Sequence, residues 1–231
     1  MSGKMLKILA LAMVMSLMSD AGAAVLRWNG SADILWSTPA NWQDSTVPSA
    51  VDTAMINVLP GPTVANEGAV ANTMWLGEGG NGGGLIIDGG TLTVNTWLFV
   101  QIGGQGDCLM NMISGTVNVS VGGFGVGMRG PATLNMTGGT VTCPGFLIGI
   151  ESGSNGFVNL DGGTITCAYF TMARDGGSAG SMDVQAGTLI VNGNAVATVR
   201  GYIDNGWITA YDGNSTLELD YDITNEGQTT L

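Results

Sequence analysis

The strongest constraint on the fold is a sequence unit that occurs five times at almost constant spacing. A Gly-Thr pair marks each unit, and successive threonines lie 25, 24, 24 and 24 residues apart. The pairs are Gly90-Thr91, Gly115-Thr116, Gly139-Thr140, Gly163-Thr164 and Gly187-Thr188. The surrounding text also repeats, as in LNMTGGTVTC and VNLDGGTITC. Such a period is typical of a solenoid, in which each repeat packs mainly on its neighbours.

Alternation within the unit indicates strands. Apolar residues occur six and four positions before each threonine, and one and three positions after it. These inward columns contain Leu85, Ile87, Leu92, Val94, Met110, Met112, Val117, Val119, Leu134, Met136, Val141, Cys143, Val158, Leu160, Ile165, Cys167, Met182, Val184, Leu189 and Val191. A period of two is typical of β-strands and not of helices. The glycines between the two stretches predict a tight corner.

A third pattern of four residues precedes each unit: an apolar residue, any residue, a second apolar residue and then a small residue. It occurs at Met74–Gly77, Val100–Gly103, Phe124–Gly127, Phe146–Gly149 and Phe170–Ala173. Each coil is therefore predicted to have three short strands, and successive coils to stack about 4.8 Å apart. The predicted fold is all-β, a parallel β-helix with about 24 residues per coil. A β-propeller fits less well, because each blade needs four strands and roughly 40 residues.

The flanking segments are predicted to cap the solenoid, which spans residues 63–200. Residues 24–62 contain Trp28, Trp36 and Trp42, whose bulk can cover the open end of the first coil. Residues 201–231 leave the 24-residue register and form the second cap or the end of the module. There we expect a helical turn near Tyr202, a strand at residues 208–210 and a terminal strand at residues 216–221.

The first 23 residues have the features of a signal peptide. Lys4 and Lys7 precede an 11-residue apolar run, Ile8–Met18, and Ala21 and Ala23 are small residues before a predicted cleavage at Ala24. The run is too short for a membrane span, which needs about 20 residues. We therefore expect a secreted or cell-surface protein with no membrane span after cleavage.

The composition excludes several kinds of chemistry. The chain has no His, and its only lysines are lost with the leader, so a catalytic triad and a Schiff base are excluded. Its net charge of −12 makes nucleic acid a poor partner, since phosphate contacts need Lys and Arg. We expect no catalytic residues, no cofactor and no metal site, because no His and no Cys-x-x-Cys motif is present.

Two of the three cysteines, Cys143 and Cys167, occupy the same inward column one coil apart. A one-coil separation lies within the Cα range of a disulfide, and export permits oxidation. The alternative is a pair of free, buried thiols, which we favour because in-register parallel neighbours suit the disulfide torsion poorly.

Outward positions also form columns. Five positions before the threonine lie Ile86, Asn111, Asn135, Asn159 and Asp183, and two positions after it lie Thr93, Asn118, Thr142, Thr166 and Ile190. Such columns suit a flat surface that recognises a polymer or a crystal. The alternative, which we favour, is that the side chains hydrogen-bond their own copies in neighbouring coils.

Candidate charged groups are few. Asp88 and Asp161 share a corner position but are three coils apart, about 14 Å, which is too far for a glycosidase pair. We interpret them as turn residues that hydrogen-bond the glycine corner. Arg129, Arg174 and Arg200 are the only basic residues of the repeat region, and we expect Arg129 and Arg174 to be solvated in bends.

The chain resembles exported bacterial β-helix proteins with autotransporter-associated or pectin-lyase-like repeats. The resemblance rests on WNGSADILWSTPANWQDSTVPSAVDTAMIN, on the repeated glycine-threonine units and on the closing GYIDNGWITAYDG. It implies export and a role as a stalk, an adhesin or a matrix component. No translocator barrel, sorting helix or lectin domain follows the repeats, so we expect a free module or part of a larger surface protein.

Two function classes remain. The first is a secreted or cell-surface structural or adhesive module without catalytic activity, whose partner is a cell-surface or matrix polymer. The second is a polysaccharide-active lyase or hydrolase, or a carbohydrate-binding β-helix. Lyases that resemble pectate lyase need an acidic calcium cluster and a basic proton acceptor, and no Asp-Asp pair occurs in this chain. We favour the first class.

Overall fold

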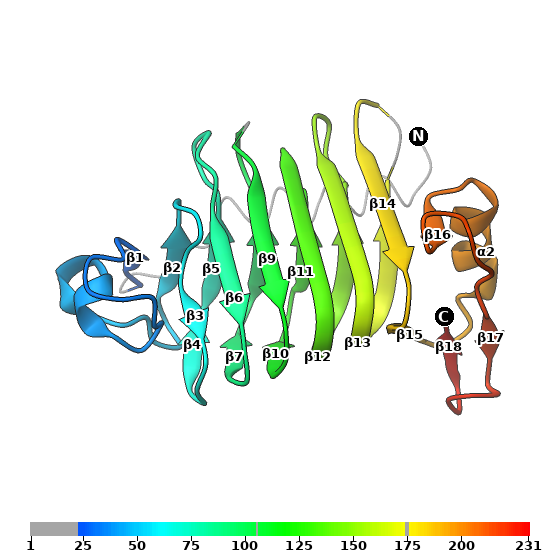
Figure 1. Ribbon diagram of the computed structural model, residues 1–231, viewed down its shortest axis with the longest axis horizontal. Coiled ribbons are helices and arrows are strands. Elements are labelled where there is room, and N and C mark those ends of the chain that lie inside the picture. The colour runs from blue at the N-terminus through cyan, green and yellow to red at the C-terminus, as the bar shows by residue number, and fades with distance from the viewer. Residues whose placement is uncertain (1–22, 105, 174–175) are drawn as a thin grey trace.

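The computed structural model describes residues 23–104, 106–173 and 176–231. The chain is 49% strand and 7% helix, and parallel coils of about 24 residues form a β-solenoid of about eight turns. The coils follow one another along the long axis (Figure 1). The predicted parallel β-helix is therefore confirmed. The predicted signal peptide, residues 1–23, lies outside the described residues except for Ala23.

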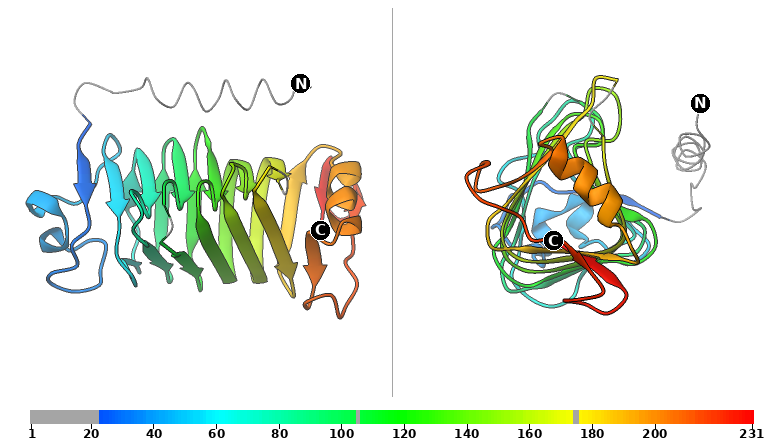
Figure 2. Two further views of the ribbon diagram at one scale, coloured as in Figure 1. Left: turned by 90° about the horizontal axis from the view of Figure 1, so that it is seen from above. Right: turned by 90° about the vertical axis from the view of Figure 1, so that its right-hand side faces the viewer.

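Three parallel ladders form the three sides of the coil (Figure 2). The first contains β3 (Thr63–Val64), β6 (Gly84–Ile87), β9 (Cys108–Met112), the start of β12 (Pro131–Ile148) and of β13 (Asn155–Met172), β14 (Ala179–Val184) and β16 (Ile208–Ala210). The second contains β4 (Ala69–Ala71), β7 (Thr91–Val94), β10 (Thr116–Val119), the middle of β12 and β13, and β15 (Thr188–Asn192). The third contains β1 (Val25–Arg27), β2 (Thr53–Ile56), β5 (Thr73–Leu76), β8 (Trp97–Val100), β11 (Gly123–Val126) and the ends of β12 and β13.

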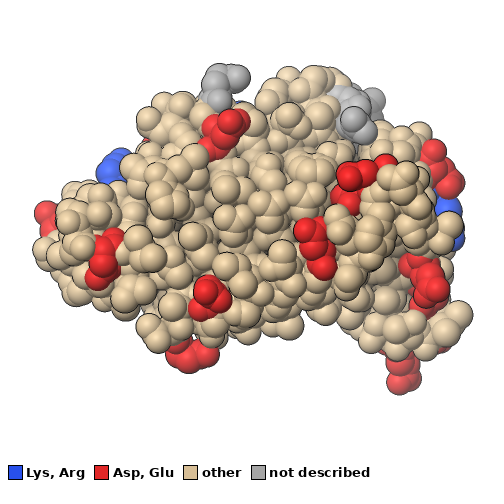
Figure 3. Space-filling model, viewed as in Figure 1, with Lys and Arg blue, Asp and Glu red and all other residues tan. Residues whose placement is uncertain are grey.

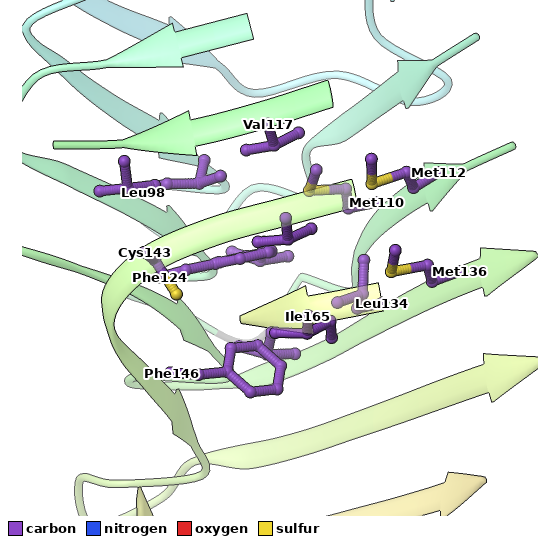
Figure 4. Close-up of a cluster of buried hydrophobic side chains, with 14 of the residues drawn as sticks. Leu98, Met110, Met112, Val117, Phe124, Leu134, Met136, Cys143, Phe146 and Ile165 are labelled. Atoms are coloured by element: carbon purple, nitrogen blue, oxygen red, sulfur yellow. The ribbon is translucent and has the colours of Figure 1, made fainter. Parts of the chain in front are cut away.

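The core consists of the predicted inward columns. All twenty apolar residues of those columns are buried. Figure 4 shows members of these columns, among them Met110, Leu134 and Ile165, pointing into one interior. Phenylalanines of the third ladder also contact one another across coils. Phe124 meets Phe146 edge to face with ring centroids 5.5 Å apart, and Phe146 stacks on Phe170 at 5.9 Å. Burial of these columns supplies the main force that holds the coils together.

One predicted strand is out of register. The sequence suggested the third pattern at Val100–Gly103, whereas Leu98 and Val100 are the inward residues, paired with Met74 and Leu76. Gln101 therefore occupies the corner that Gly77 occupies one coil earlier, and both have positive φ, 67° and 68°. The Gln101 side chain compensates by accepting the amide of Gly103 and by donating to the carbonyl of Gly106. The register was mispredicted because this corner, which glycine normally occupies, is occupied by a glutamine.

The N-terminal cap is built around three tryptophans. The ring centroid of Trp42 lies 5.2 Å from that of Trp28 and 4.7 Å from that of Trp36, and all three side chains are buried. The Trp42 indole also donates to the Trp36 carbonyl at 2.7 Å. A short 3-10 helix, η1 (Pro39–Asn41), lies between Trp36 and Trp42, and a second, η2 (Gln43–Ser45), follows Trp42. The ladders begin before residue 63, because β2 already pairs with β5.

The C-terminal cap begins with α2 (Val196–Asp204), so it straddles the predicted boundary at residue 200. Tyr202 on this helix meets the Phe170 ring edge-on at 5.7 Å and stacks on Trp207 at 5.6 Å. The expected helix and the strand at residues 208–210 are confirmed.

The terminal strand predicted over residues 216–221 is limited to β17 (Asp220–Tyr221), since residues 216–219 lack a partner strand. The chain returns instead as β18 (Gln228–Thr230), which pairs antiparallel with β15 and with β17. This return covers part of the otherwise open edge of the solenoid.

Candidate functional site

Aromatic side chains and glycines share the outward side of the third ladder. One column contains Trp75, Phe99, Gly125 and Leu147, and the next contains Trp97, Gly123, Gly145 and Tyr169. We call the residues with large side chains in these columns (Trp75, Trp97, Phe99, Leu147 and Tyr169) the aromatic patch. None of the residues in the two columns is charged.

Glycines allow the aromatic rings to rest on the backbone of the neighbouring coil. A Cβ atom at Gly122 would lie 2.5 Å from Cε2 of Trp97, and one at Gly123 would lie 3.0 Å from Cζ3. A Cβ atom at Gly145 would collide with the ring of Tyr169. The rings of Trp97 and Tyr169 therefore lie on bare backbone, an arrangement that also stabilises glycines in a sheet.

Exposure within the patch is uneven. Phe99 is 2% exposed, and its ring stacks on Trp97 with centroids 5.2 Å apart and planes 12° apart. Trp97 is half-buried, whereas Tyr169 is 41% exposed. Burial, with smaller effects of Cys143 and Cys167, raises the pKa of Tyr169, so its hydroxyl stays protonated and can donate at neutral pH. The patch thus offers ring surface and a neutral hydroxyl.

The aromatic patch was missed by the sequence analysis. Its signal is an aromatic residue at outward positions of β5 and β8, with glycine at the same position one or two coils later. The third apolar pattern was used only to find inward residues, and its misplaced register at Val100 hid Trp97 and Phe99.

The asparagine column of the first ladder forms a hydrogen-bonded ladder, as favoured. Asn135 donates to the side-chain oxygen of Asn111 at 3.0 Å, and Asn159 donates to that of Asn135 at 2.8 Å. Asp183 continues the column but is buried, and its Oδ1 accepts from the Thr209 hydroxyl and the Asp212 amide. Each of these side chains is therefore engaged by a neighbouring coil.

The threonine columns of the second ladder behave differently. Within the described residues, one side-chain pair links neighbouring coils there, Thr116 and Thr140 at 3.3 Å. The outward side chains two positions after each threonine, such as Thr142 and Thr166, make no hydrogen bond to the described protein. Ladder formation is therefore confirmed for the asparagines and is wrong for this second column, whose hydroxyl groups face solvent.

The three cysteines are free and buried. Cys143 and Cys167 are register partners in β12 and β13, as the column predicted. Burial raises the pKa of Cys108 to about 11 and that of Cys167 to about 12, and it raises the pKa of Cys143 as well. At neutral pH these side chains are thiols and not nucleophilic thiolates. They contribute to packing in the core.

The candidate carboxylates are not brought together. Asp88 accepts from the Ser114 hydroxyl at 3.2 Å, while the buried Oδ1 of Asp161 has no partner among the described residues. Their predicted hydrogen bonds to the glycine corner are therefore not what the structure shows. Arg129 forms an ion pair with Glu151 at 2.6 Å, with 55% and 34% of their side chains exposed. Arg200 lies on α2, and Arg174 lies outside the described residues.

A shallow pocket lies beside the N-terminal cap. It has a volume of about 120 Å³, and its lining includes Trp36, Val47, Val64 and Glu67. Ligand pockets are commonly about 300–1,000 Å³, so this one is small for a substrate. The indole nitrogen of Trp36 is buried and has no partner among the described residues. The pocket collects no group of catalytic side chains.

Acidic residues are dispersed over the surface. Figure 3 shows them separated by wide areas of uncharged residues on the face that carries the first ladder. In the described part of the chain, no three His, Cys, Asp or Glu residues are grouped so as to hold a metal ion. Among residues 23–104, 106–173 and 176–231, no helix has the length and apolarity needed to cross a membrane.

The fold places this chain in the class of parallel β-solenoid proteins. No protein-family model, curated protein or solved structure matches it.

Proposed function

We propose that this chain is an exported β-solenoid module that acts as a structural or adhesive element outside the cell, without catalytic activity. The observation that carries the proposal is the separation of its reactive side chains. Asp88 and Asp161 stay three coils apart, and Arg129 is held by Glu151. The regular features are the stacked core and the uncharged outer columns, which suit a stiff module with extended surfaces.

A direct assay compares this proposal with the polysaccharide lyase. The protein, expressed with its own leader and purified after export, is incubated with pectate and calcium while absorbance of unsaturated products is followed. We expect no product. We also expect that replacement of Arg129, Arg174 and Arg200 by Gln leaves the melting temperature unchanged, and that the variant attaches to the cell surface or matrix as the parent does. Product formation that the triple variant loses, at an unchanged melting temperature, would establish the lyase instead.

The aromatic patch favours a second candidate function, binding of an uncharged polysaccharide. Pyranose rings present apolar C–H faces that pack on aromatic rings, and Tyr169 adds a hydroxyl donor beside its exposed ring. The columns of the patch are uncharged, and the net charge of −12 repels polyanions such as pectate. Neutral glycans therefore suit this face better than acidic ones.

Co-sedimentation with insoluble cellulose and gel retardation in soluble neutral glucan test this binding. We expect Tyr169→Ala and Trp97→Ala each to weaken binding roughly two- to twelvefold, since one aromatic contact contributes about 0.5–1.5 kcal/mol. Tyr211→Ala is the matched control, because Tyr211 is 48% exposed but lies in the C-terminal cap. Failure of the parent to bind any neutral glucan, or equal binding by all variants, would reject this function for the patch.

A further inference from the structure

Ala24, the residue before β1, is held through both its backbone N–H and its carbonyl. The backbone N–H of Ala24 donates to Oδ1 of Asp52 at 3.2 Å. The Ala24 carbonyl accepts from the Thr53 amide at 2.8 Å, and β1 begins at the next residue. Ala24 is therefore fixed against the beginning of β2.

Asp52 is a nearly buried carboxylate that has no cationic partner among the described residues. It is 9% exposed, and its Oδ2 accepts from the Ser49 amide at 3.0 Å and from the Ser49 hydroxyl at 2.5 Å. The backbone of Asp52 also accepts from the Asn72 amide. None of these groups titrates, and within the described residues the ion pair found is that of Arg129 with Glu151. The donor to Oδ1 is the Ala24 nitrogen itself, so a positive charge on that nitrogen would act directly on this carboxylate.

The sequence predicts that the bond before this nitrogen is the one cut during export. Hydrolysis by a signal peptidase adds one water across the Ala23–Ala24 peptide bond, leaving a carboxylate on Ala23 and an amine on Ala24. An α-amine has a pKa of about 7.7–8.0 and is mostly protonated at neutral pH. The neutral amide donor becomes an ammonium group at the same place.

We propose that removal of residues 1–23 pairs the new α-ammonium group of Ala24 with the Asp52 carboxylate, so that the processed chain gains an ion pair at the start of β1. This inference rests on the export proposed above. It makes Asp52 the receptor for the mature N-terminus. The ion pair would also explain why the cap contains the Asp52 carboxylate, of which one oxygen accepts from Ser49 and the other accepts from Ala24.

The pairing defines a pH window. The ammonium gains a partner on folding, so its pKa rises, and its stabilisation is complete below about pH 7.7 and lost as the pH rises through the raised value. Hydrogen bonds from Ser49 and the Ala24 amide lower the pKa of Asp52 against the effect of burial. Its stabilisation is therefore present above the unfolded value and lost as the pH falls through the lowered one.

The test compares chains that differ only at the α-amine. One chain starts at Ala24 with a free amine, which is obtained by removal of an initiator methionine, and the second is the same chain N-acetylated. We expect the free-amine chain to melt about 2–4 °C higher at pH 6, with the difference gone at pH 10. Asp52→Asn should remove the difference at pH 6. NMR titration should give the Ala24 amine a pKa above its ordinary range.

Equal melting temperatures, or a difference that survives in Asp52→Asn, would overturn the pairing. If Asp52→Asn does not fold, the amine pKa and the pH dependence of the free and acetylated chains decide the question. N-terminal sequencing of the exported full-length chain distinguishes a failure of the predicted cleavage from a failure of the predicted ion pair. A start other than Ala24 contradicts the processing step, whereas a start at Ala24 with an ordinary amine pKa leaves export standing and rejects the role of Asp52.

Discussion

Val119→Asp is expected to prevent the chain from folding. Val119 ends β10, is 4% exposed and is the register partner of Val94 in an apolar inward column that continues to Cys143. A carboxylate there would lie among buried apolar side chains, and burying it costs several kcal/mol or forces it to take up a proton. Because a domain is stable by only about 5–15 kcal/mol, this cost removes most of the margin. Circular dichroism and thermal unfolding of the purified variant measure the outcome.

The adjacent residue provides the control. Asn118 lies on the same strand with its side chain outward, so Asn118→Asp adds the same charge on the solvent side. We expect its free energy of unfolding to stay within about 0.5 kcal/mol of the parent value. A soluble, strand-rich Val119→Asp protein with the parent's melting temperature would show that the inward assignment of this column is wrong.

Deletion of one complete coil, Thr140 to Gly163, is expected to leave a folded and shorter solenoid. The deletion joins Gly139 to Thr164, and these corners are equivalent: Gly139 and Gly163 have φ of 83° and 77°, and Thr140 pairs with Thr164. Each coil contacts mainly its neighbours, so the new neighbours meet through the same columns. A cooperative thermal transition and an unchanged strand spectrum are the expected result.

A half-coil deletion is the matched comparison. Removing Thr140 to Glu151 takes out the second- and third-ladder parts of β12 and joins a corner to a bend, so the following strands lose their register. A shift of register exposes inward residues, and we expect the fold to be lost. Equal damage from both deletions would argue for a globular β-sandwich instead of a modular solenoid.

The repeated part of the fold could be predicted from sequence because alternation and register carry the same information in every coil. Columns such as Leu134 with Val158, and Val141 with Ile165, pair in the structure as the spacing of the threonines requires. Parallel in-register stacking places equivalent residues above one another, so five copies corroborate each assignment. The tryptophan cap could be predicted because the first coil of a solenoid has an open end that bulky apolar side chains can cover.

The features that could not be predicted lie where one residue departs from the repeat pattern, or where the chain continues beyond the repeats. Gln101 at a left-handed corner displaced the expected strand by two residues, because propensity assigns such corners to glycine. The antiparallel return of β18 onto β15 has no counterpart in the repeat, so periodicity carries no signal for it. The aromatic patch depends on which glycine lies under which ring, which only the pairing of neighbouring coils reveals.

Small-angle X-ray scattering of the parent and of the Thr140–Gly163 deletion tests the central claim, that the chain is a stack of equivalent coils, most directly. Removing one coil should shorten the particle by about 4.8 Å, the rise between neighbouring strands, and leave the radius of gyration of its cross-section unchanged. A particle that keeps its length and becomes thinner, or one that expands as an unfolded chain does, would contradict the stacked solenoid.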